Sequence, residues 1–254
     1  MQMRKILMML LVCFAVPAYS AGNAGFKLYS ANVDLSDKAS LQRGAKYFVN
    51  YCMGCHSLSH LRYNRLGRDL GLTDRQVEEN LIFTRDEEGS PTRVGELMTI
   101  AMDKFYADKS FGVVPPDLTL TARSRTPNWI YTYLLTFYND SSKQWGVNNA
   151  VFPNAGMPNV LWALQGEQKP IYQEITDSHG STHQQISGFE LVKPGLMSPE
   201  EFDQAALDLT NFLTYAAEPA KLVRYKIGAW VMAFLLIFAV VSYVLKKEYW
   251  RDIK

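Results

Sequence analysis

Apolar side chains recur at the spacing of an α-helix in two well-separated segments of the chain. Across residues 41–52 they follow a period of 3.6 residues, and Gly44 lies among them. The same period returns across residues 202–216, after the sequence Ser-Pro-Glu-Glu at 198–201, which combines an N-cap serine, a proline at the first helical position and a capping-box glutamate. We therefore predict one helix over 41–52 and another from 199 to about 217, and we expect the glycine to let them cross closely.

Weaker patterns fill the sequence between these two helices. They predict helices at about 74–82, 93–107 and 128–138. The stretch 141–195 is rich in glycine, proline, asparagine and glutamine, so we expect long loops there, with a short hairpin around 186–192. The whole pattern predicts a mainly α-helical domain with long loops.

An apolar run near the N-terminus is typical of a secretory signal peptide. Arg4 and Lys5 precede an apolar run at 6–16, and small residues follow it. We expect cleavage after Ser20, which makes residues 1–20 the signal peptide, with cleavage after Ala21 as the near alternative. A retained membrane anchor is the other interpretation, and it is disfavoured because eleven residues are too few to span a bilayer comfortably.

A second apolar run, at 227–245, contains nineteen residues without a charge. A helix of this length reaches about 28 Å, close to the thickness of a membrane's hydrocarbon core. Basic residues lie on both sides of the run. We predict that residues 221–254 form a C-terminal anchor, with a transmembrane helix at about 227–245 and a short cytoplasmic tail. The signal peptide would then direct the domain of residues 21–220 to the periplasm.

Composition and charge exclude several classes of protein. The 254-residue chain is 48% hydrophobic and 20% charged, and its net charge of +1 provides no polycationic surface for nucleic acid. Two basic residues lie in the signal peptide, and seven basic and two acidic residues follow residue 220, so residues 21–220 carry a formal net charge of −6. This charge favours a basic partner, with Asp86, Glu87 and Glu88 as a candidate patch, although ordinary solubility explains it equally well.

The strongest chemical signal is the sequence C-x-x-C-H formed by Cys52, Cys55 and His56. This is the attachment sequence of c-type haem. Two thiols about one helical turn apart can add to the two vinyl groups on one edge of a porphyrin, and the adjacent histidine is then directed beneath the ring to ligate iron. The third cysteine, Cys13, lies in the signal peptide and leaves with it.

Three other interpretations of the cysteine pair are weaker. A thioredoxin-like redox pair needs a βαβ pattern, which does not precede the motif. A structural zinc site needs two further ligands, and although His60, His179 and His183 are present, there is no second cysteine pair. A plain disulfide leaves His56 without a role. The sequence therefore favours one covalently bound haem c.

Six-coordinate haem iron needs a ligand on its other face, and Met157 is the best candidate. It lies in a loop where the preceding glycine permits close approach to the ring and the following proline stiffens the backbone. Met98 and Met102, four apart in a predicted helix, and Met197, beside the cap of the last helix, are better explained by packing. His60 lies too near the motif histidine to reach the opposite face.

The order of several short motifs identifies a family resemblance. They are CMGCHSL at 52–58, RYNR at 62–65, PPDL at 115–118, GMP at 156–158 and residues 212–219, followed by a single C-terminal anchor. Together they resemble bacterial cytochrome c1 over nearly the whole mature chain. The resemblance implies an elaborated cytochrome c fold, mainly α-helical with long loops, plus one C-terminal transmembrane helix.

The resemblance also implies a function and a set of partners. The chain would be the haem c subunit of the cytochrome bc1 complex, a dimeric ubiquinol:cytochrome c oxidoreductase, in the bacterial inner membrane with its haem domain facing the periplasm. Cytochrome b and membrane lipid would surround its anchor. The Rieske iron-sulfur protein would supply electrons, and a soluble or membrane-bound c-type cytochrome would accept them.

The chain itself would have no bond-making active site, although it would be the electron-transfer subunit of quinol–cytochrome-c reductase. The alternative is a free-standing membrane-anchored electron shuttle or an oxidase-associated cytochrome c.

Particular residues acquire roles from this resemblance. It implies that Cys52 and Cys55 form the thioether bonds, that His56 is the proximal iron ligand and that Met157 is the distal ligand. It also implies that an arginine pairs with a haem propionate and that prolines line the haem edge. The matching residues are Arg125, with Arg123 as the fallback if the register slips by two, and Pro115 and Pro116. Unlike many members of the family, this chain has no pair of cysteines before the methionine loop to form an extra disulfide.

Overall fold

The computed structural model of the chain describes residues 26–86, 88–176 and 182–252. The predicted signal peptide, Cys13 and His179 lie outside the described residues. The helices are α2 (Lys38–Tyr47), the π-helical turn η1 (Phe48–Cys52), α3 (Tyr63–Leu70), α4 (Asp74–Leu81), α5 (Lys104–Phe111), α6 (Thr121–Ser124), α7 (Pro127–Leu135), α8 (Trp162–Gln165), α9 (Pro199–Ala217) and α10 (Lys221–Tyr249). The strands are β1 (Leu58–Arg62), β2 (Leu97–Met98), β3 (Phe137–Asn139), β4 (Val147–Asn149), β5 (Gly166–Thr176) and β6 (Thr182–Pro194).

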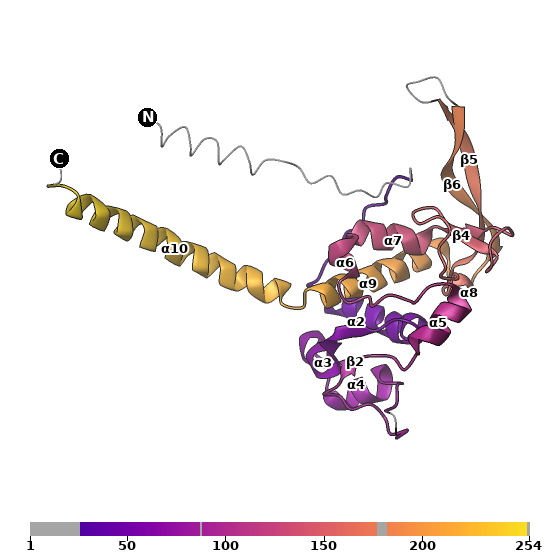
Figure 1. Cartoon of the computed structure of the whole chain (residues 1–254), viewed down its shortest axis with the longest axis horizontal. Helices are drawn as coiled ribbons and strands as arrows, with labels where there is room; N and C mark the ends of the chain where they lie inside the picture. Colours follow the sequence, from indigo (N-terminus) through magenta and orange to yellow (C-terminus); the bar gives the residue numbers. More distant parts are fainter. Residues whose placement is uncertain (1–25, 87, 177–181, 253–254) are drawn as a thin grey trace.

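The helices α2 and α9 pack against each other at the centre of the domain (Figure 1). Gly44 lies at their crossing, where a Cβ atom would collide with the carbonyl oxygen of Asp208 and lie 2.6 Å from Cβ of Phe212. The rings of Phe48 and Phe212 meet just beyond it, with centroids 5.6 Å apart. The predicted close crossing at this glycine is therefore confirmed.

A buried polar cluster fixes the register of the same crossing. The Asp208 carboxylate, on α9, accepts hydrogen bonds from Ser40 Oγ at 2.7 Å, Arg43 Nε at 2.6 Å and Gln204 Nε2 at 2.9 Å. Asn211 donates to Ser40 Oγ at 2.7 Å. Because each of these polar groups has a buried partner, sliding one helix along the other would leave charges and amides unpaired in the core.

The sequence signals at the start of α9 are also confirmed. The Ser198 hydroxyl accepts a hydrogen bond from the Glu201 backbone N–H, the Glu201 carboxylate accepts one from the Ser198 N–H, and Pro199 occupies the first helical position. The apolar stripe predicted on this helix is buried in the main core: Phe202, Ala206, Leu209, Phe212, Leu213 and Ala216.

The helix predicted over 93–107 is wrong. Residues 94 and 96 instead accept hydrogen bonds at the start of α3, and Met98, on β2, pairs with Leu58 on β1. A helix begins only at α5, where the Asp103 carboxylate accepts hydrogen bonds from the backbone N–H groups of Phe105 and Tyr106. Met98 is fully buried and Val94, Leu97 and Ile100 are partly buried, although residues 94–103 form no helix.

Two other boundaries also differ from the sequence-based expectation. The helix expected over 128–138 ends at Leu135, because residues 137–139 pair as β3 with β4.

The loop region expected over 141–195 contains a long antiparallel hairpin, β5–β6, which projects from the domain (Figure 1). Its strands carry ion pairs between Lys169 and Glu190 and between Lys193 and Glu167. Because most residues of both strands are partly or fully exposed, the hairpin lacks the alternation of apolar and polar residues that marks a half-buried strand.

The C-terminal helix α10 leaves the domain after α9 and extends away from it (Figure 1). Residues Val223–Tyr249 are long and apolar enough to cross a membrane, and none of that apolar window is buried. The predicted C-terminal apolar helix is thus confirmed, with bounds a few residues wider than expected.

The crossing of α2 and α9 yields a stability prediction. We expect Gly44→Ala to lower the free energy of unfolding by about 1–3 kcal/mol, because the new methyl group meets backbone that cannot move aside. Gly95→Ala is the matched control, since a Cβ atom there meets nothing within 4 Å, and we expect a change of less than about 0.5 kcal/mol. Urea unfolding of the two variants measures the difference, and equal effects would show that the crossing tolerates a side chain.

Candidate haem-binding site

The C-x-x-C-H sequence forms a tight turn at the end of the central helix. The chain continues from α2 through η1, whose last residue is Cys52. The carbonyl oxygen of Cys52 accepts hydrogen bonds from the backbone N–H groups of Cys55, at 3.1 Å, and His56, at 2.9 Å. This turn holds two thiols and an imidazole on neighbouring residues at the edge of the main core.

The surroundings of the two cysteines argue against a redox pair. Cys52 is buried and Cys55 is partly exposed. Burial raises the pKa of Cys52 to about 12, and burial also raises the pKa of Cys55. A thioredoxin-like pair depends on a lowered thiol pKa, so these environments have the opposite effect from the one such chemistry needs.

The imidazole of His56 is prepared to bind a metal through one nitrogen. Its Nδ1 atom lies 2.7 Å from the carbonyl oxygen of Pro116, so Nδ1–H donates there and Nε2 is the unprotonated nitrogen. Burial lowers the pKa of His56, which outweighs the opposing effects of the Pro116 carbonyl and the Asp117 carboxylate. The ring is therefore neutral, as a metal ligand must be.

The backbone after His56 is bonded to the segment of residues 115–119. Leu118 N–H donates to the carbonyl oxygen of Ser57 at 3.0 Å. The Asp117 carboxylate accepts hydrogen bonds from the N–H groups of Ser59 and Thr119, each at 2.8 Å. Pro116 therefore contributes its carbonyl oxygen, as the partner of the histidine, in addition to any contact made by its ring.

The methionine loop packs against the other end of the same segment. A Cβ atom on Gly156 would lie 2.8 Å from Val113 Cγ1 and 3.2 Å from the carbonyl oxygen of Phe111, so only glycine fits there without a shift. Val113 and Pro116 are three residues apart, which limits their Cα separation to about 11 Å. The segment 111–118 thus brings the histidine turn and the Met157 loop into one region.

The sulfur of Met157 has a defined neighbour. Tyr133, on α7, donates a hydrogen bond from its hydroxyl to Met157 Sδ at 3.4 Å. Burial raises the pKa of Tyr133, so the hydroxyl stays protonated. A thioether sulfur has two lone pairs, and the second remains available for a metal.

Arg125 lies beside the methionine loop. It follows α6, and its guanidinium carbon is 5.3 Å from the ring centroid of Trp129 and 6.0 Å from that of Phe152. Within the described ranges Arg125 forms no ion pair with a carboxylate. Arg123 is also exposed but has no aromatic contact of this kind among the described residues, so the geometry distinguishes the two arginines.

These residues fit a haem c group. In the part of the chain that the structure describes, no three His, Cys, Asp or Glu side chains cluster to hold a bare metal ion. A porphyrin brings four nitrogen ligands of its own and needs only the histidine and a sulfur from the protein. Apolar side chains on the surrounding loops are 37–49% exposed, and a porphyrin packed there would cover them: Val113, Val114, Leu120 and Phe152.

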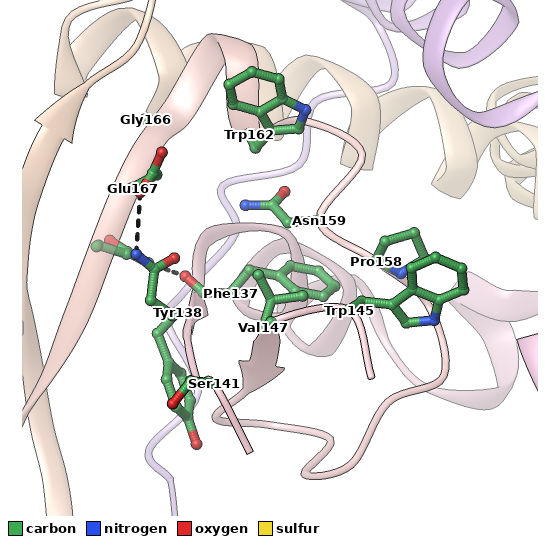
Figure 2. A pocket seen from close by; sticks show the side chains of 13 residues that line it. Phe137, Tyr138, Ser141, Trp145, Val147, Pro158, Asn159, Trp162, Gly166 and Glu167 are labelled. Carbon is green, nitrogen blue, oxygen red and sulfur yellow. Dashed lines mark hydrogen bonds between the residues drawn. The ribbon is translucent and has the colours of Figure 1, made fainter. Parts of the chain in front are cut away.

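A separate pocket of about 560 Å³ adjoins the methionine loop (Figure 2). Figure 2 shows Trp145, Pro158 and Trp162 around it. Neither the C-x-x-C-H residues nor Met157 line this pocket, which touches the candidate site only through Pro158. Its position next to the methionine loop makes it a neighbour of the haem-binding region and not the site itself.

The other methionines and His60 have structural surroundings. Met98 is fully buried on β2, while Met102 is partly buried in the loop that follows and not in a helix. Met197 packs against the main core, as predicted. His60 is exposed, and its backbone N–H donates to the Thr119 hydroxyl.

Sequence reasoning missed two residues that organise the site, Tyr133 and Asp117. Tyr133 has aromatic residues four positions away on each side, and this spacing is a signal that could have pointed to a stacked helix face. Asp117 belongs to the PPDL motif, but its hydrogen bonds depend on contacts with residues about sixty positions away.

Comparison with known proteins agrees with this site. The family model described as Cytochrome C1 family matches residues 29–253. The chain belongs to the cytochrome c1 family. Cytochrome c1 of Allochromatium vinosum is 48% identical over 99% of this chain and all of its own length, and cytochrome c1 of Blastochloris viridis is 30% identical over 86% and 82%. A protein named ammonia monooxygenase gamma subunit, from Nitrosomonas europaea, is 41% identical over the full length of both chains.

Membership of the cytochrome c1 family confirms the expected fold class and cofactor. The chain has a mainly helical cytochrome c fold with one C-terminal apolar helix, and the family carries covalently bound haem c. As a c-type cytochrome of the bc1 complex, the chain is a subunit of an oxidoreductase with an electron-transfer role.

The Asp117 carboxylate, which accepts hydrogen bonds from Ser59, just after His56, and from Thr119 in its own segment, yields a pH prediction. Burial raises the pKa of Asp117, but the hydrogen bonds from Thr119 and Ser59 lower it more, so that the pKa lies below its ordinary value. Its stabilising effect is therefore present above the unfolded-state pKa of about 3.9 and is lost as the pH falls through the folded-state pKa.

We expect Asp117→Asn to be less stable than the wild type at pH 7. The carboxylate accepts one hydrogen bond on each oxygen, from Ser59 and Thr119, whereas the amide has an acceptor oxygen on one side only. The difference should shrink towards pH 2. Urea unfolding of the holoprotein at both pH values measures it, and a difference independent of pH would contradict a role for the ionised carboxylate.

Proposed function

We propose that this chain is the haem c subunit of a bacterial bc1 complex, which accepts electrons from the Rieske iron-sulfur protein and passes them to a c-type cytochrome. The observation that carries the proposal is the convergence of the C-x-x-C-H turn and the Met157 loop on the segment 111–118. Bound haem c supplies a one-electron iron couple, and no residue needs to act as acid, base or nucleophile.

In this proposal each residue at the site has a distinct task. Cys52 and Cys55 form the thioether bonds, which hold one edge of the porphyrin to the turn after η1. His56 binds iron through Nε2, and the Pro116 carbonyl keeps its ring oriented. Met157 binds iron through its sulfur.

The exposed guanidinium of Arg125 pairs with a propionate, which would give a charge partner to a cation that has no carboxylate beside it within the described ranges. Trp129 and Phe152 hold that guanidinium in place by cation–π contacts.

The proposed topology follows from the two ends of the chain. Residues 1–20 are the signal peptide, residues 21–220 form the periplasmic domain, and residues 221–254 hold it to the bacterial inner membrane. The ion pair between Glu218 and Arg224, at 2.9 Å, ties the end of α9 to the start of α10. This contact links the periplasmic domain to the start of the anchor.

The partners in this proposal are cytochrome b and membrane lipid around α10, and the Rieske protein and a c-type cytochrome at the periplasmic domain, within a dimeric complex. The net charge of −6 on residues 21–220 favours a basic electron acceptor. The proposed patch at 86–88 has weaker support, because Glu87 lies outside the described residues and Asp86 accepts a hydrogen bond from Ser90 within its own turn.

The first test concerns the haem and the complex. The purified mature chain should exceed the mass of residues 21–254 by one haem, and replacing both Cys52 and Cys55 with alanine should abolish covalent retention. Cytochrome b and the Rieske protein should co-purify with the tagged full-length chain. A haem-bearing chain that purifies without them from gently solubilised membranes would instead support a free-standing or oxidase-associated cytochrome.

The second test concerns the distal ligand. We expect Met157→Leu to keep its covalent haem, since thioether attachment does not depend on the distal ligand, but to lose the weak sulfur-to-iron charge-transfer band at the red end of the visible spectrum. The reduction potential should fall, or a high-spin form should appear. Met102→Leu is the control and should keep the band. Survival of the band in Met157→Leu would show that another methionine is the ligand.

A further inference from the structure

Tyr133 is held rigidly by its neighbours on and around α7. Its ring stacks on Trp129, with centroids 5.0 Å apart and planes 10° apart, and it meets the ring of Phe137 edge to face, also at 5.0 Å. Trp129 and Tyr133 are four positions apart on α7, so they lie on one face of the helix, and Phe137 begins β3 just after the helix ends. The direction of the Tyr133 hydroxyl is therefore fixed by packing.

The methionine loop is tied to the same helix end by buried amides. Asn149, which is fully buried, donates to the carbonyl oxygen of Tyr133 at 2.8 Å and accepts hydrogen bonds from the N–H groups of Val151 and Phe152. Asn148 accepts a hydrogen bond from the Asn154 N–H at 2.8 Å. These bonds position the backbone that leads to Met157 relative to Tyr133.

We propose that the Tyr133 hydroxyl, through its hydrogen bond to Met157 Sδ, positions the distal sulfur and raises the reduction potential of the haem. The inference rests on the proposed ligation of iron by Met157. One sulfur lone pair accepts the hydrogen bond at 3.4 Å, and the other would be available to iron. The hydrogen bond withdraws electron density from the sulfur, which weakens its donation to the ferric ion more than to the ferrous ion.

Packing alone does not require a tyrosine at this position. Phenylalanine would keep the stack on Trp129 and the contact with Phe137, since both involve only the ring. Among the described residues the hydroxyl has Met157 Sδ as its hydrogen-bond partner. The oxygen therefore has a separable function, and Tyr133→Phe removes that function without removing the ring.

The test is the reduction potential of Tyr133→Phe in the haem-loaded, full-length protein. We expect the equilibrium between reduced and oxidised haem to shift about threefold to tenfold towards the oxidised form, the range expected for the loss of one hydrogen bond. A tenfold shift corresponds to a fall of about 59 mV for one electron. The sulfur-to-iron charge-transfer band should persist, because the ligand itself is retained.

The chain offers a matched control in Tyr63→Phe. Tyr63 donates a hydrogen bond to the sulfur of Met53 at 3.5 Å, which is the same kind of bond at nearly the same length. Met53 lies between the two thioether cysteines and is not the proposed iron ligand. We expect the equilibrium between reduced and oxidised haem in this variant to stay within twofold of that in the wild type.

The outcomes separate this inference from the proposed function. If the wild-type protein lacks the charge-transfer band, ligation by Met157 is wrong and the inference falls with it. If the band is present but the potential of Tyr133→Phe equals that of the wild type, Met157 remains the ligand and only the role of Tyr133 is overturned. An equal shift in Tyr63→Phe would also overturn it, because the effect would then follow from losing any buried hydroxyl.

Discussion

The close crossing of α2 and α9 at Gly44 is the constraint on which the rest of the structure depends. Because α2 continues through η1 into the C-x-x-C-H turn, the angle and register of this crossing decide where the two thiols and His56 lie. A side chain at position 44 would push the helices apart, and the buried carboxylate of Asp208 prevents them from sliding. The haem-binding turn is thus positioned from the core and not by its own loop.

The second half of the site is positioned by the loop at 111–118, which has no regular secondary structure beyond the end of α5. Its rigidity comes from specific contacts: the Pro116 carbonyl meets His56, and Val113 packs against Gly156. Prolines suit such a segment because they restrict the backbone without needing partners for amide hydrogens. A short, stiff connection between the two proposed ligands sets their separation more reliably than two independent loops would.

The sequence allowed the prediction of those features that depend on local signals. The capping box at Ser198, the helical period over 41–52 and the C-x-x-C-H spacing each operate within a few residues, and the fold class and family followed from them. The helix over 93–107 was wrong because a helical apolar pattern also suits buried residues such as Met98 that pair with a distant strand. The hairpin was predicted only as a short one around 186–192, whereas those residues form part of one strand, β6, and its partner β5 was not predicted because most residues of both strands are at least partly exposed. The partners of Asp117 and Tyr133 depend on tertiary contacts, which no local pattern reveals.

Electron transfer changes the charge of a metal without making or breaking a bond to a substrate, so the protein must above all keep the ligands still. In the proposed site each ligand side chain is bonded to a second, uncharged group: His56 to the Pro116 carbonyl and Met157 to the Tyr133 hydroxyl. The guanidinium of Arg125 lies over the rings of Trp129 and Phe152 instead of against either ligand's partner. Since neither partner carries a charge, the ligand environment can be tuned by hydrogen bonds without the desolvation cost that a buried ion would impose.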